Sequence, residues 1–220
     1  MTETGKTRRE RLQAARVYFV VEGGAPESLL RAALAGGADM LQLRDKRASD
    51  EELLRAAATF RSVCDEHAAL FWLNDRPDLV AEARADGVHV GQDDEPVDAV
   101  RAAVGEDVLV GLSTHSPEQL DAALATSADQ LSVGPVYETP TKEGRPATGL
   151  GYVSYAAQRV GGSRPWFAIG GIDTQNVREV VAAGAGRAVV VRAIRDAGDP
   201  AAAAGELRAA LEVRPVGTAQ

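Results

Sequence analysis

The sequence predicts a single-domain α/β protein, a closed (β/α)8 TIM barrel, and the first observation behind this prediction is a repeat along the chain. Four similar stretches each pass from small residues into an apolar strand: AGGADMLQLR, EARADGVHVG, ATSADQLSVG and AAGAGRAVVV. Their Ala-Asp pairs at 38, 85 and 128 and the Ala-Gly pair at 185 are 47, 43 and 57 residues apart. Because one βα unit needs about 30 residues at most in compact folds, each interval holds about two units.

Eight stretches with strand composition are the second observation. They are RVYFVV (16–21), DMLQLR (39–44), LFWLN (70–74), GVHVG (87–91), VLVGLS (108–113), QLSVGPV (130–136), WFAIGG (166–171) and AVVVRA (188–193). Helical patterns lie between them, with a capping box at Ser49 and Glu52, a cap at Ser116, and a helix start at Asp173 or Thr174. Strands that alternate with helices pair in parallel, and eight units indicate a barrel. An open doubly wound sheet is the alternative, but no G-x-G-x-x-G follows the first strand.

Composition limits the class of protein and its partners. The chain is 45% hydrophobic and 25% charged, which is typical of a globular domain. We expect an N-terminal extension over residues 1–14, frayed or helical, a catalytic barrel over 15–212 and a flexible tail over 213–220. The net charge of −8 argues against nucleic acid and membrane partners. The single cysteine, Cys64, indicates a reducing cytoplasm, and the sequence leaves homo-oligomer formation open.

Polar residues gather where the predicted strands end, and this is where barrel enzymes place their active sites. In chain order they are Gln42, Arg44, Lys46, Asn74, Asp75, Gln92, Asp93, Asp94, Ser113, Thr114, His115, Glu138, Thr139, Thr141, Lys142, Gly170, Gly171 and Arg192. The alternation in LQLR places Gln42 and Arg44 on the strand face opposite to Leu41 and Leu43. We therefore expect the two polar residues to point into the top of the barrel, with Lys46 on its rim.

The charges at these strand ends suit a polyphosphate that is bound together with a metal ion. The cations are Arg44, Lys46, Lys142 and Arg192, and the carboxylates on neighbouring loops are Asp75 and Asp94. Mg²⁺ usually takes one or two protein carboxylates together with substrate oxygens, while cations neutralise the remaining phosphate charge. Asp75 can alternatively be a turn residue and Asp94 a helix cap, and Asp93 is a rival ligand.

The glycines of AIGGI (168–172) indicate a second phosphate site, after the seventh predicted strand. Glycine lets backbone amides approach an anion, and the loops after strands seven and eight hold phosphate in many such barrels. A tight turn would use the same glycines. TPTKEGRPATG (139–149) lies between the two sites and is either a mobile lid or a long surface loop. The sequence therefore predicts two phosphorylated ligands.

Seven motifs in order resemble the thiamine-phosphate synthase family: QLRDK (42–46), LND (73–75), GVHVGQDD (87–94), GLSTHS (111–116), GPVYETPTK (134–142), AIGGI (168–172) and VVVRAI (189–194). The resemblance implies an Mg²⁺-dependent transferase that joins a pyrimidine diphosphate to a thiazole phosphate and releases pyrophosphate. It implies that the pyrimidine diphosphate contacts Gln42, Arg44, Lys46, Asn74, Ser113 and Lys142, of which Arg44, Lys46, Ser113 and Lys142 are catalytic. It further implies Mg²⁺ on Asp75 and Asp94, and thiazole phosphate on Thr139, Thr141, Gly171, Val191 and Arg192.

Two positions depart from the family pattern. The family commonly has Ser at the position of Arg192, and the first strand ends in VVEGG where Thr-Asp is more usual. The thiazole nitrogen is itself the nucleophile in the implied reaction, so we expect a dissociative substitution without a protein nucleophile. The main alternative is a thiazole tautomerase with His115 as its base. A Schiff-base aldolase would need a lysine inside a strand, and a non-catalytic phosphate-binding barrel has no use for the two carboxylates.

Overall fold

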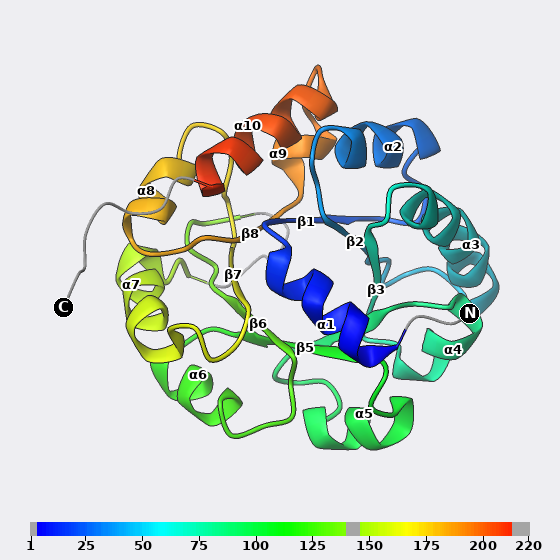
Figure 1. Cartoon of the computed structure of the whole chain (residues 1–220), viewed down its shortest axis with the longest axis horizontal. Helices are drawn as coiled ribbons and strands as arrows, with labels where there is room; N and C mark the ends of the chain where they lie inside the picture. The colour runs from blue at the N-terminus through cyan, green and yellow to red at the C-terminus, as the bar shows by residue number, and fades with distance from the viewer. Residues whose placement is uncertain (1–3, 140–145, 213–220) are drawn as a thin grey trace.

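Eight parallel strands close into a barrel in sequence order, and helices surround it (Figure 1). The structure, a computed structural model, describes residues 4–139 and 146–212. The strands are β1 Val17–Val21, β2 Met40–Leu43, β3 Leu70–Asn74, β4 Gly87–Val90, β5 Leu109–Thr114, β6 Gln130–Val133, β7 Trp166–Ile169 and β8 Ala188–Val190. The helices are α1 Gly5–Ala14, α2 Glu27–Ala35, α3 Asp50–Glu66, α4 Val80–Ala83, α5 Val97–Val104, α6 Pro117–Ala123, α7 Gly149–Val160, α8 Val177–Ala182, α9 Arg192–Arg195 and α10 Pro200–Glu212, with the 3₁₀ turn η1 at Pro77–Leu79. The predicted (β/α)8 barrel is confirmed.

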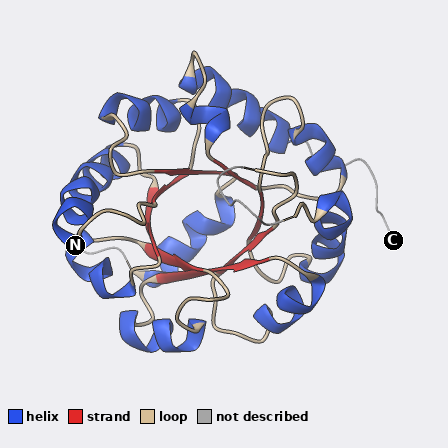
Figure 2. Ribbon diagram, turned by 180° about the vertical axis from the view of Figure 1, so that it is seen from behind, coloured by secondary structure: helices blue, strands red, loops and turns tan. Residues whose placement is uncertain are grey.

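Two hydrophobic cores follow from the period-two alternation of the strands. Leu41 and Leu43 face outward and belong to the larger core, between the strands and the ring of helices (Figure 2). Met40, on the opposite face of β2, belongs to a smaller core inside the barrel that also contains Tyr18 and Trp72. The inner core fills the lower part of the barrel, so the polar residues further along the strands lie above it. None of the helices within residues 4–139 and 146–212 is both long and apolar enough to cross a membrane.

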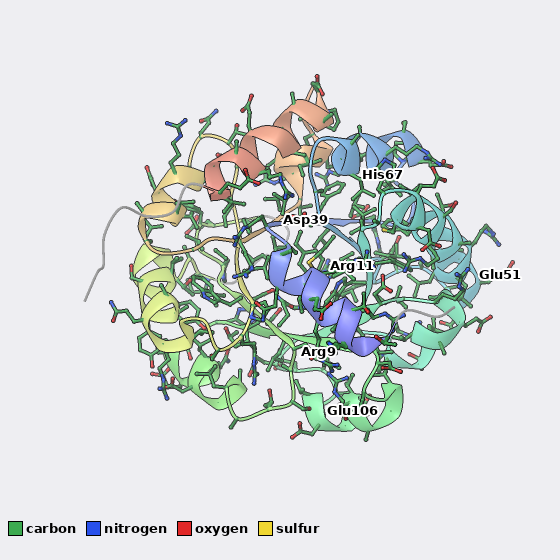
Figure 3. The ribbon with its side chains drawn as sticks, viewed as in Figure 1. Arg9, Arg11, Asp39, Glu51, His67 and Glu106 are labelled. Carbon is green, nitrogen blue, oxygen red and sulfur yellow. The ribbon has the colours of Figure 1, made fainter. Side chains whose placement is uncertain are left out.

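Helix α1 lies across the amino-terminal end of the barrel (Figures 1 and 3). Its Leu12 is buried in the inner core. Arg9 donates to the carbonyl of Glu106 at 2.9 Å, and Arg11 donates to the carbonyl of Ala68 at 2.6 Å. The helix therefore forms a floor that shields the inner core from solvent at the end opposite to the strand C-termini.

The repeated aspartates are structural and lie at this same end. Each carboxylate accepts a hydrogen bond from a backbone amide of the preceding strand: Asp39 from Val17, Asp86 from Phe71 and Asp129 from Val110. Each also pairs with arginine: Asp39 with Arg208, Asp86 with Arg8 and Arg61, and Asp129 with Arg9 and Arg101. At the fourth repeat, Gly186 has no carboxylate, and Arg187 donates to the carbonyls of Gln13 and Ala15 at the end of α1. The repeat thus reflects how each strand start is joined to the preceding strand and to arginines of the helices.

Some predicted element ends differ from those in the structure. Strand β6 ends at Val133 because Pro135 has no N–H to continue the ladder. Strand β8 ends at Val190, since Val191 leaves the extended region at ψ −83° and begins α9. The helix after β7 begins at Val177 with Asn176 as its cap, and not at Asp173 or Thr174. The capping box of Ser49 and Glu52 is present as predicted.

Candidate active site

A cavity of about 290 Å³ opens at the C-terminal ends of the strands. Eight of the predicted site residues line it: Gln42, Arg44, Asn74, Ser113, Thr139, Gly171, Val191 and Arg192. Lys46, Asp75 and Asp94 are not among the lining residues, and Thr141 and Lys142 lie outside the described residues. Tyr18, His89 and Ser132 also line the cavity, although the sequence did not single them out as a group. One concave surface therefore brings together residues from most of the strands.

Tyr18 and Gln42 form a polar contact on the β1–β2 side of the cavity. Gln42 donates from Nε2 to the Tyr18 hydroxyl at 2.5 Å, and both side chains are buried. Trp72 and Phe167 pack against the Tyr18 ring, with centroids 5.8 and 5.7 Å away. Burial raises the pKa of Tyr18 well above its usual range, which keeps the hydroxyl protonated. The lower cavity wall is thus aromatic with a few fixed hydrogen-bonding groups, as in many small-molecule sites.

Arg44 brings a positive charge to the wall of the cavity. It follows β2, and its amide donates to the Val21 carbonyl at 3.0 Å, which extends the ladder by one residue. Its side chain is half-buried, and no ion pair or hydrogen bond among the described residues uses its guanidinium group. An unpaired cation in a partly desolvated cavity attracts anions strongly. Arg44 is therefore well placed to bind a phosphate group.

Lys46 and Asp75 meet on the rim beside the cavity. The Lys46 Nζ atom lies 2.9 Å from Oδ2 of Asp75. Asp75 has φ +58°, in the left-handed region, where only Gly, Asn and Asp are common. Its amide donates to the His89 carbonyl at 2.9 Å, so the turn is held against β4. This arrangement keeps the carboxylate at the end of β3 and next to a lysine.

Asp94 lies in the turn that follows β4, the strand beside β3. Its Oδ2 accepts from the Gly91 amide at 2.7 Å, so it closes this turn and does not cap α5, whose cap is Pro96. No cluster of three or more His, Cys, Asp or Glu side chains in residues 4–139 and 146–212 could hold a metal. Two carboxylates on adjoining loops nevertheless fit Mg²⁺, which usually takes only one or two from the protein. The two carboxylates are thus compatible with an Mg²⁺ ion whose other ligands come from a substrate and water.

A buried row of polar side chains crosses β4, β5 and β6 inside the barrel. Gln130 donates to Ser132 Oγ at 2.9 Å, its Oε1 is 3.1 Å from His89 Nδ1, and His89 Nε2 is 2.9 Å from Ser113 Oγ. Strand register places His89 and Gln130 on either side of Gly111. A Cβ atom at Gly111 would lie within 2.5 Å of both side chains, so only glycine leaves room for the contact. The row fixes the position of Ser113 at the cavity wall.

His115 anchors the loop after β6. Its Nδ1 lies 2.5 Å from the Gly134 carbonyl oxygen, and its backbone amide donates to Gln119 at 2.8 Å. A carbonyl oxygen can only accept, so Nδ1 carries a proton. This contact gives His115 a structural task, although the residue also lines the cavity.

Glycines form the cavity wall between β7 and α8. Gly170 and Gly171 have φ +104° and +66°, which other residues rarely adopt. A Cβ at Gly170 would lie 2.5 Å from Pro135, and one at Gly171 would lie 2.7 Å from the Tyr137 Cβ. The backbone of Gly170 and Gly171 can therefore pack against the loop after β6 and still approach a ligand in the cavity. Arg192, which also lines the cavity, is the first residue of α9.

The chain is a (β/α)8 barrel whose cavity lies at the strand C-termini, where barrel enzymes place their active sites. The sequence matches the family Thiamine monophosphate synthase over residues 17–194. Thiamine-phosphate synthase of Acidothermus cellulolyticus is 52% identical over 205 residues, covering 91% of this chain and 96% of that protein. Thiamine-phosphate synthase of Mycobacterium bovis is 46% identical over 214 residues, covering 91% and 96%.

Solved structures agree with the sequence comparison. Thiamine phosphate pyrophosphorylase from Pyrococcus furiosus superimposes with a TM-score of 0.82 at 31% identity, covering 93% of this chain and 97% of that one. A 3-hexulose-6-phosphate synthase, at 21% identity and a TM-score of 0.64, shares the fold alone. The chain belongs to the thiamine monophosphate synthase family, which confirms the resemblance drawn from its seven motifs.

Proposed function

We propose that this protein condenses 4-amino-2-methyl-5-(diphosphooxymethyl)pyrimidine with a thiazole phosphate, giving thiamine phosphate and pyrophosphate. The observation that carries the proposal is one cavity at the strand ends that is lined by two cations from different βα units. Arg44 lies on the β2 side, and Arg192 lies beside the glycine turn on the β7–β8 side. The same cavity therefore offers a separate cation to each of two phosphorylated substrates. Family membership and relatives named thiamine-phosphate synthase support the same reaction.

The reaction breaks the bond between the pyrimidine methylene carbon and the diphosphate oxygen. The electron pair of that bond leaves with pyrophosphate, and the thiazole nitrogen then supplies the pair for the new C–N bond. In this proposal Arg44 and Lys46 neutralise the charge that grows on the leaving group. Gln42, Asn74 and Ser113 orient the pyrimidine diphosphate, and the buried walls of the cavity exclude water. We place Lys142, which lies outside the described residues, beside the same leaving group.

The remaining expected groups complete the proposal. Asp75 and Asp94 would hold Mg²⁺, which, when bound, neutralises diphosphate charge. Lys46, now paired with Asp75, would then turn to a substrate oxygen. The thiazole phosphate would lie among Thr139, Thr141, Gly171, Val191 and Arg192. We place the protein in the cytoplasm, where the buried thiol of Cys64 would stay reduced.

One assay tests the proposed function. The purified protein, with both substrates and Mg²⁺, is expected to release pyrophosphate and form thiamine phosphate in equal amounts. Omission of either substrate should abolish both products, since pyrophosphate release is coupled to ring joining. Interconversion of thiazole tautomers without pyrophosphate would instead support the isomerase alternative.

The replacement Asp75→Asn tests the proposed metal site. Asn tolerates the left-handed backbone at φ +58°, so the turn should survive while the charge is lost. We expect the Mg²⁺ concentration for half-maximal turnover to rise by about tenfold or more, by analogy with the loss of a metal-site partner. The matched control is Asp78→Asn, three positions along, where the carboxylate pairs with Arg76. An unchanged Mg²⁺ requirement in Asp75→Asn would remove Asp75 from the metal site.

A further inference from the structure

Two backbone amides of the glycine turn have no acceptor among the described residues. The Gly170 carbonyl accepts from the Tyr137 amide at 3.0 Å, and the Gly171 carbonyl accepts from Asn176 Nδ2 at 2.8 Å. In a trans peptide the N–H of the next residue points opposite to the carbonyl. These bonds therefore turn the amides of Gly171 and Ile172 away from Tyr137 and Asn176. Gly171 and Ile172 both line the cavity.

The orientation of the Asn176 side chain is fixed by its two backbone partners. Its Oδ1 accepts from the Asp173 amide at 2.9 Å, while its Nδ2 donates to the Gly171 carbonyl. A backbone N–H can only donate and a carbonyl can only accept, so exchanging the two amide atoms would break both bonds. Asn176 is also the N-cap residue of α8, which begins at Val177. It thus ties the glycine turn to the start of a helix.

The amides of Gly171 and Ile172 indicate why Asn176 holds the turn in this conformation. Ile172 is only 4% exposed, and a backbone N–H that is shielded from water carries a free-energy cost until it finds an acceptor. Successive free amides in a turn are a common way to bind an anion, which would remove that cost. Arg192, which lines the same cavity, adds a positive charge to this end.

We propose that Asn176 is a positioning residue for the thiazole phosphate. By holding the Gly171 carbonyl on the outer side of the turn, it aims the Ile172 amide at the phosphate oxygens. The Tyr137 amide does the same for Gly171 through the Gly170 carbonyl. This inference rests on the proposed function, in which the phosphate of that substrate lies at the glycine turn. Asn176 itself makes no contact with the substrate.

The replacement Asn176→Asp separates this role from a general structural one. The aspartate keeps an acceptor for the Asp173 amide but sets a carboxylate oxygen against the Gly171 carbonyl, so the peptide loses its anchor. Gln175→Glu is the matched control, because it makes the same amide-to-acid change one residue earlier. Gln175 is exposed, and no hydrogen bond among the described residues uses its side chain. The control therefore measures the effect of the added negative charge alone.

In steady-state kinetics of the full chain, the variant should bind thiazole phosphate more weakly and the other substrate as before. We expect the KM for thiazole phosphate to rise about tenfold or more in Asn176→Asp, while kcat and the KM for the pyrimidine diphosphate change little. With the unphosphorylated thiazole alcohol, kcat/KM should equal that of the parent, because no phosphate meets the turn. An equal loss with the alcohol, or a Gln175→Glu variant that matches Asn176→Asp, would overturn the inference.

A second measurement does not depend on catalysis. The ¹⁵N–¹H resonances of Gly171 and Ile172 are followed while inorganic phosphate is added to the full chain. Both should shift in the parent and in Gln175→Glu, and should stay in place in Asn176→Asp. Amides that respond in a protein without synthase activity would support the inference and contradict the proposed function. If the protein is active as a synthase but the Ile172 resonance does not shift with phosphate, the inference is wrong and the proposed function stands. If Asn176→Asp does not fold, Asn176→Ala loses the same donor and takes its place.

Discussion

Replacing Arg44 by methionine should lower kcat/KM by about 10²–10³-fold, as the loss of one preorganised donor does at other sites of developing charge. Arg44 is the cation on the β2 side of the cavity, and no carboxylate among the described residues neutralises it. Its full charge is therefore available to the diphosphate, whose charge grows as the C–O bond breaks. Methionine keeps much of the side-chain volume, so the cavity wall should hold its shape. Steady-state assays with both substrates measure the change.

Two further variants make this prediction specific. Arg47→Met removes a cation three positions along, in an exposed side chain that borders a separate hollow with Asp45 and Glu52. It should leave kcat/KM within about twofold, because exposed charges at a distance are screened by salt. Arg44→Lys keeps the charge but not the two-pronged geometry, and should recover part of the loss. Equal losses in Arg44→Met and Arg47→Met would show that the assay senses overall charge and not a diphosphate contact.

The barrel and the mouth of its cavity could be predicted because both depend on short-range patterns. Period-two alternation is a property of one strand, and it placed Leu41 and Leu43 outward and Gln42 and Arg44 at the cavity. The rule that barrel sites lie at strand C-termini then gathered residues from separate strands onto one rim. Neither step needs the register between strands.

The buried row of His89, Gln130 and Ser132 could not be predicted in this way. His89 and Gln130 are 41 residues apart, and they meet only because the register puts Gly111 between them. A sequence signal does exist, since polar residues alternate with Val88, Val90 and Leu131 in strands that are otherwise apolar. That pattern marks inward-facing polar groups without saying which of them are partners.

The sequence left open whether residues 1–14 are frayed or helical, and it did not predict where helix α1 packs. Its buried residues are only Gly5 and Leu12, so it lacks the apolar stripe that usually marks a packed helix. It is held mainly by arginines that reach carboxylates and carbonyls at strand starts, such as Asp86 and Asp129. Both the basic N-terminus and the repeated Ala-Asp pairs were visible in the sequence. Their connection requires the closed barrel, which brings the strand starts together.

Replacing Asp86 by alanine should therefore reduce the free energy of unfolding by about 3–5 kcal/mol, as expected when one partner of a buried ion pair is removed. The Asp86 side chain accepts from Arg61 and from the Phe71 amide, both at 2.8 Å, and from Arg8 of α1 at 3.1 Å. Alanine would remove the buried counter-charge of Arg61, leaving it only the half-exposed Asp65, and would leave the Phe71 amide without its acceptor. Urea unfolding should show a lower midpoint with an unchanged slope.

Asp65→Ala is the matched control, because Asp65 pairs with the same Arg61 at 2.8 Å but is about half exposed. Its removal should cost no more than about 1 kcal/mol, the usual value of an exposed pair. Comparable losses in the two variants would mean that burial does not set the strength of the Asp86 network. Asp86 lies at the amino-terminal end of the barrel, whereas the cavity opens at the other. The folded fraction of Asp86→Ala should therefore keep the parent kcat, so that stability and catalysis separate along the barrel axis.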